Sequence, residues 1–138
     1  MEEYFLTISV PANTSSSSPV EEEIEVEGDY VYEVAYLIPS GHVALTGLRI
    51  FYGDLQLLPR NRDEWVKGDN VYRSVKVRWN FRSRKIELTF RAYNEDDTYD
   101  HTFYVWIVTA DRSEVLMFER LERLLSAFVA FIRRLGGF

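Results

Sequence analysis

The residue types that most often carry out chemistry are sparse in this 138-residue chain, which contains two histidines and no cysteine. Without cysteine, disulfides and thiolate metal sites are excluded. His42 follows the turn residues Ser40 and Gly41, and His101 opens an apolar segment. Neither histidine has the spacing of a metal-ligand pair or of a catalytic dyad, so we expect both to be structural.

The most polar segment is residues 94–100, which reads Asn-Glu-Asp-Asp-Thr-Tyr-Asp. Its oxygen atoms could bind Ca²⁺, but the segment lacks the glycine-containing spacing of an EF-hand loop. Asn and Asp side chains commonly hydrogen-bond within their own turn, so we favour a solvated turn with Asx hydrogen bonds and leave Ca²⁺ binding open.

No phosphate-binding loop, nucleophile elbow or dinucleotide-binding fingerprint occurs in the chain. We therefore expect no enzyme, with no catalytic, cofactor-binding or metal-binding residues. An enzyme would become the better hypothesis if Asp97, Asp100 and His101 converged in a polar pocket.

Charge gives a second constraint on function. The net charge of −6 argues against direct nucleic-acid binding, which depends on neutralising phosphates. An acidic block occupies residues 21–29 and a basic block residues 60–85, and we interpret them as complementary faces of neighbouring strands or subunits. No apolar run reaches the roughly 18 residues of a membrane-spanning helix.

The elements that position these residues are mainly strands. Strand signals mark eight segments, most of them with alternating apolar and polar residues: 4–10, 20–26, 30–38, 44–52, 55–58, 71–81, 86–93 and 101–109. This predicts an antiparallel β-sandwich or jelly roll of seven to eight strands over residues 1–110. The run of glutamates in residues 21–25 is typical of an edge strand, and residues 82–85 are expected to be a hairpin connection.

Two strands carry finer predictions. In residues 30–38, the two-residue period of a strand places five residues on one face: Tyr30, Tyr32, Val34, Tyr36 and Ile38. In residues 101–109 both faces are apolar, with Tyr104 and Trp106 opposite the face of Phe103. A strand of this kind is covered on both sides, so the C-terminal helix or a neighbouring subunit must lie over its second face.

Residues 111–138 form a C-terminal amphipathic helix that Asp111 or Ser113 can cap and that Gly136 and Gly137 end. A heptad seam runs along it, widened by Met117, Leu124 and Phe131, and its members are Phe118, Leu121, Leu125, Phe128, Ile132 and Leu135. This seam can pack on its own sandwich or against other copies. A third alternative, a helix lying on a membrane, is disfavoured by the balanced charges.

Exposed aromatic residues allow a second functional hypothesis, a carbohydrate- or ligand-binding module. Its possible rim consists of Trp65, Tyr93 and Tyr99. Filling of the core or of an interface is the alternative role for these rings.

Three stretches of the chain resemble a family of small phage virion structural proteins. They are residues 8–14 with Pro19-Val20, residues 38–53 with Leu58-Pro59 and Trp65, and residues 92–102. The chain departs from the family at Asn13, where a glycine is expected, and the C-terminal helix lies outside the resemblance. The resemblance implies a β-sandwich located on or in a virion and supplies no catalytic residues.

Together these observations predict a virion structural protein of a bacteriophage, most simply a capsid decoration, cement or connector-type subunit. We expect it to form a homo-oligomer and to contact other virion proteins. The predicted oligomer interface consists of the six seam residues with Tyr104 and Trp106. High arginine content and the missing cysteine are compatible with a thermophilic source, although a GC-rich genome explains the arginine content equally well.

Overall fold

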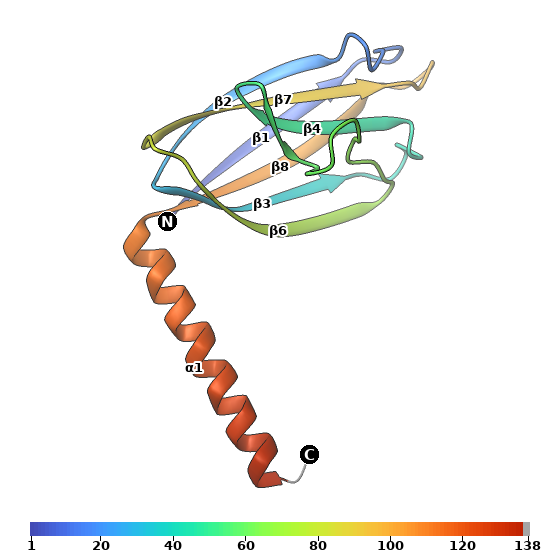
Figure 1. The fold of residues 1–138 in the computed structure, drawn as a ribbon. Coiled ribbons are helices and arrows are strands. Elements are labelled where there is room, and N and C mark those ends of the chain that lie inside the picture. The colour runs from blue at the N-terminus through green and yellow to red at the C-terminus, as the bar shows by residue number, and fades with distance from the viewer. Residues whose placement is uncertain (137–138) are drawn as a thin grey trace.

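The computed structural model describes residues 1–136 as eight strands followed by one helix (Figure 1). The elements are β1 Glu2–Val10, β2 Val20–Glu27, β3 Tyr30–Ile38, β4 Thr46–Tyr52, β5 Leu55–Leu58, β6 Val71–Asn80, β7 Lys85–Asn94, β8 His101–Ala110 and α1 Arg112–Gly136. The predicted strands are confirmed in number and in order. The last two residues of the predicted helical segment, with the proposed stop at Gly137, lie outside the described residues.

The strands form two four-stranded antiparallel sheets, in the orders β1-β8-β3-β6 and β2-β7-β4-β5. The pairs β1–β8, β2–β7, β3–β6 and β4–β5 show that one long antiparallel ribbon is folded over on itself, which is the jelly-roll arrangement. The prediction for residues 82–85 was wrong. They cross from β6 in one sheet to β7 in the other, so they are not a hairpin.

The space between the sheets is filled by the apolar face of each strand. Ile8 and Val10 of β1 meet Phe103, Val105 and Ile107 of β8, and all five are fully buried. The inward faces predicted for these strands and for β7 are therefore confirmed. The alternation places the side chains correctly because successive residues of a strand point to opposite faces.

Strand β3 breaks the predicted alternation. Its pairing with both neighbours shifts between Val31 and Glu33, which marks a β-bulge. Val31 consequently joins the core between the sheets, whereas Tyr32 packs in a separate cluster at the start of α1. The predicted single face is correct for Val34 onward and wrong for Tyr30 and Tyr32.

The charged strands lie at the edges of the sandwich. β2 is the edge of its sheet, as its glutamates predict, and Glu21 bonds Arg91 of the adjacent β7 at 2.7 Å. The basic β6 is the edge of the other sheet, so the acidic and basic blocks are not neighbouring strands within one chain. The interpretation of the two blocks as neighbouring strands was therefore wrong, and their pairing between subunits stays a prediction.

Helix α1 does not fold back over either sheet. Only Asp111 separates the end of β8 from the start of α1, and so short a connection leaves no loop to reverse the chain. In Figure 1 the helix accordingly leaves the end of the sandwich and projects away from it. Within residues 112–136, Val115 is the one buried residue.

A candidate self-association surface

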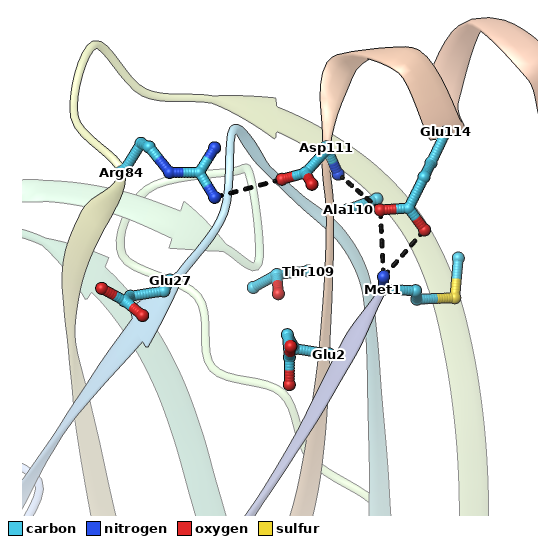
Figure 2. Close-up of a pocket in the computed structure, with 8 residues that line it drawn as sticks. All are labelled: Met1, Glu2, Glu27, Arg84, Thr109, Ala110, Asp111 and Glu114. Carbon is cyan, nitrogen blue, oxygen red and sulfur yellow. Dashed lines mark hydrogen bonds and ion pairs between the residues drawn. The ribbon is translucent and has the colours of Figure 1, made fainter.

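The first turn of α1 is fixed to the end of the sandwich by a capping network (Figure 2). Glu114 accepts the backbone N–H of Asp111 at 3.1 Å, and the Asp111 carbonyl accepts the N–H of Val115, also at 3.1 Å. Glu114 also pairs with the Met1 ammonium at 2.8 Å. This pairing lowers the pKa of Glu114 and raises that of the amino terminus. Asp111 directly precedes the first helical residue, where the prediction placed a cap, and the side-chain bond found there is the one that Glu114 makes back to Asp111.

A second set of polar contacts holds the same turn from the β2–β3 and β6–β7 connections. Arg84 pairs with Asp29 at 3.0 Å and with Asp111 at 3.3 Å. Asp29 in turn accepts the backbone N–H of Arg112 at 2.9 Å. The backbone N–H groups of Asp111 and Arg112, which have no partner within the helix, are therefore both hydrogen-bonded. The carboxylates at this end also interact favourably with the helix dipole.

The next two turns rest on the bulged part of β3. Val115 is 4% exposed and packs with Tyr32 and Ala110, and the Phe118 ring lies 5.5 Å from the Tyr32 ring. Tyr32 reaches the helix because the bulge turns it out of the sandwich core. The bulge and the capping network together set the direction in which α1 leaves the sandwich.

Glu122 is the last residue of α1 with an ion pair to the sandwich among the described residues. It pairs with Arg78 at 3.3 Å and with Lys76 at 3.5 Å, both on β6. Val115, Phe118 and Glu122 are spaced three and four residues apart and so lie on one side of the helix. Past Glu122, the remaining 123–136 segment extends beyond the sandwich (Figure 1).

The apolar face of α1, here named the α1 stripe, consists of Met117, Phe118, Leu121, Leu124, Leu125, Phe128, Phe131, Ile132 and Leu135. Phe118 is half-buried, whereas Phe128 is 60% and Leu135 70% exposed. With about half of each side chain exposed, and large apolar side chains of 150–250 Å², the stripe exposes roughly 1,000 Å². That exceeds the roughly 300–600 Å² of the largest apolar patch on a typical monomer.

The other two predicted interface residues, Tyr104 and Trp106, belong to a second apolar surface. We name it the outer aromatic face, and its members are Phe5, Leu37, Tyr72, Tyr104 and Trp106 on the solvent side of the β1-β8-β3-β6 sheet. The Phe5 ring lies 5.3 Å from Trp106 and 6.2 Å from Tyr104, and Tyr72 lies 6.1 Å from Trp106. α1 of the same chain does not cover this face, so the first of the two predicted covers is ruled out, and cover by a neighbouring subunit stays a prediction.

The three residues of the possible ligand rim do not form one. Tyr93 is only 2% exposed, and its ring fills the space above Gly47, so its role at a rim is corrected. Trp65 contacts Tyr93 edge-on at 4.7 Å, and the Arg49 guanidinium covers its ring at 4.0 Å. Trp65 therefore anchors its loop, and Tyr99, 67% exposed, remains as a separate surface residue.

The histidines are brought together, which their separation in sequence conceals. His42 is 1% exposed and its ring lies 4.5 Å from that of His101. His42 Nε2 donates to the Thr102 carbonyl at 3.1 Å, and Nδ1 accepts from the Thr46 hydroxyl at 2.7 Å. Burial lowers the pKa of His42, and the adjacent His101 lowers it further. With both nitrogens occupied, His42 has the structural role that the sequence predicts.

The polar loop closes on itself through Asx hydrogen bonds, as predicted. Asp96 Oδ1 accepts the N–H groups of Thr98 and Tyr99, and Oδ2 accepts from His101 Nε2 at 2.8 Å. The bond to His101 is the main cause of the lowered pKa of Asp96. Asp97 bonds Thr98 and Asp100 bonds the Ala12 backbone, so these carboxylates do not converge with His101 on a pocket. In residues 1–136 no three His, Asp or Glu side chains are grouped to hold a metal ion.

Comparison of the chain with protein-family models and with curated proteins gives no match. Within the described residues 1–136, α1 is not apolar enough along its length to cross a membrane.

Proposed function

We propose that this protein is a non-enzymatic structural subunit that assembles with copies of itself through the α1 stripe. The observation that carries the proposal is an apolar helix face held in a fixed direction by its own capping network and left exposed. A helix meant to be solvated would not repeat large apolar residues at heptad positions. A helix meant for its own core would not be capped so that it points away from that core.

The stripe has the width expected for burial against more than one surface. Leu121, Phe128 and Leu135 run along its middle, with one further row of apolar residues on each side. Three apolar residues per heptad form a broader face than the two-residue seam of a simple coiled-coil pair. Burial of such a face, at about 25 cal/mol per Å², stabilises an assembly strongly enough to offset the cost of association.

The particle we propose for this subunit is a bacteriophage virion, where it serves as a decoration, cement or connector-type protein among other virion proteins. The resemblance of three stretches within residues 8–102 to small virion proteins supports this assignment. The jelly roll is compatible with it, because viral capsid domains use this fold, although lectins use it too. The acidic β2 edge and the basic β6 edge, on opposite sides of the subunit, favour contacts between unlike edges of neighbours.

The experiment compares the mass of the wild-type protein with those of two charge variants by light scattering after size exclusion. Phe128→Asp places a carboxylate in the stripe, and Ala130→Asp places the same charge on the opposite side of the helix as a matched control. We expect an oligomer for the wild type and for the control, and a folded monomer for Phe128→Asp. A wild-type protein that stays monomeric at all micromolar concentrations and does not co-sediment with phage capsids would contradict the proposal.

A further inference from the structure

We propose that the outer aromatic face is the docking site for α1 of a second copy, so that two subunits exchange helices. This inference rests on the proposed self-association and adds what the α1 stripe binds. The alternative, in which stripes bind only one another, leaves the outer aromatic face exposed.

The face is continuous and is built by cross-strand neighbours. Phe5, Trp106 and Ala35 are aligned across three strands, and Ala35 is only 6% exposed beneath the rings. The next row aligns Tyr104 with Leu37, and Leu37 with Tyr72 on the edge strand. Phe5 and Tyr72, at the two sides, are 53% and 60% exposed. Such a surface with a small residue near its centre suits the ridge of an apolar helix.

The outer aromatic face and the start of the α1 stripe lie on the same side of the sheet, separated by the row of Glu3, Val108 and Glu33. A groove of about 290 Å³ lies where the helix leaves the sandwich, lined by Met1, Tyr32 and Lys76 from the sandwich and by Phe118, Leu121 and Glu122 from α1. A partner's helix that lies on the outer aromatic face can therefore contact the α1 stripe of the same subunit at this groove. One occupant would cover both apolar surfaces.

Length and charge agree with a helix as the occupant. Residues 123–136 of α1 extend for about 20 Å at 1.5 Å per residue. Along β8, the outward-pointing residues from Thr102 to Val108, of which Tyr104 and Trp106 belong to the outer aromatic face, cover about 20 Å at 3.3 Å per residue. Residues 123–136 include three arginines and no acidic residue. On the sheet, Val108 is flanked in register by Glu3 and Glu33, which supply the opposite charge.

The occupant must come from another copy because the capping network directs each helix away from its own sheet. In a two-fold exchange, each subunit docks its own α1 on the partner's outer aromatic face and receives the partner's α1 on its own face. The roughly 1,000 Å² exposed by each stripe compares with about 800 Å² per partner in a standard stable interface. The exchange therefore has enough area for a specific dimer.

The test uses full-length variants that separate the helix from the face. Phe5→Asp charges the outer aromatic face, and Leu55→Asp is its matched control, because Leu55 is a similarly exposed apolar residue, 56% against 53%, in the other sheet. Tyr72→Asp repeats the test on a different strand in case one variant folds poorly. Assembly is measured by sedimentation, and folding by circular dichroism.

We expect Phe5→Asp and Tyr72→Asp to weaken assembly at least thirtyfold, with Leu55→Asp unchanged. Mixing Phe5→Asp with Phe128→Asp should restore a dimer, because the intact helix of the first variant can dock on the intact face of the second. If Phe128→Asp is monomeric while both face variants assemble like the wild type, the helix exchange is wrong and self-association stands. A face that binds glycans on an array, with assembly unaffected by Phe5→Asp, overturns the inference as well. A wild type that is monomeric removes both proposals.

Discussion

Two phenylalanines of this chain should respond to alanine substitution in opposite ways. Phe90 is fully buried between the sheets, whereas Phe128 is 60% exposed on α1. If the α1 stripe is buried only between copies, Phe90→Ala lowers the free energy of unfolding of each subunit, and Phe128→Ala lowers only the free energy of association. The pair therefore tests directly where the helix belongs.

The magnitudes follow from the exposed areas. Deletion of a buried phenylalanine ring costs about 3–5 kcal/mol of stability, since the transfer free energy is lost and a cavity remains. The exposed 60% of Phe128 corresponds to roughly 100 Å² still available for burial, worth about 2.5 kcal/mol at 25 cal/mol per Å². Phe128→Ala should then weaken association by nearly a hundredfold for each ring buried.

The assay is urea unfolding at a submicromolar and at a high micromolar concentration, together with sedimentation equilibrium. Phe90→Ala should reduce the free energy of unfolding at both concentrations. Phe128→Ala should match the wild type at the low concentration and fall below it at the high one, where assembly stabilises the wild type. A loss of several kcal/mol in the dilute Phe128→Ala monomer would refute the reasoning, because it would place the ring in the subunit's own core.

Two further predictions concern the sandwich itself. Burial and the adjacent His101 lower the folded-state pKa of His42 below 6.5, so the stability that neutral His42 contributes is present above pH 6.5 and is lost as the pH falls through the lowered pKa. Urea unfolding at pH 7.5 and at pH 5.5 should show this loss of stability in the wild type and a smaller loss in His42→Gln. Gly47→Ala should cost about 2–3 kcal/mol, since its Cβ would lie 2.2 Å from the Tyr93 ring and 2.9 Å from Trp65; an unchanged thermal midpoint would contradict the packing described for Trp65.

Most of the fold could be predicted because apolar and polar residues alternate in most strands, where one face of the strand points to the core and the other to solvent. β7 and β8 place the predicted residues inward, and the glutamates of β2 mark an edge. The alternation failed at Tyr32 because one extra residue in β3 changes the face of everything before it. The hairpin predicted for residues 82–85 failed for another reason, since a turn sequence does not tell whether the next strand joins the same sheet.

The surfaces were predicted less completely than the fold. The heptad spacing identified the α1 stripe, and the doubly apolar β8 identified Tyr104 and Trp106. Phe5 was missed as part of their surface because a single aromatic residue on the polar side of a strand carries no periodic signal. The contact of His42 with His101 could not be read from the sequence either, because it depends on how the β3–β4 connection packs against the start of β8.

What decides between burial of α1 within one chain and burial between chains is the connection before the helix, more than the helix itself. The same apolar stripe on a longer linker could fold back onto the outer aromatic face of its own subunit, and the chain would then be a self-contained monomer. Asp111 is the only connecting residue, and it is bonded to Arg84 and to Glu114. The helix therefore cannot turn back to the outer aromatic face of its own subunit. Inserting a flexible linker of about ten residues after Asp111 should therefore convert an exchanged dimer into a monomer, because the helix can then reach the face beside it at a high effective concentration.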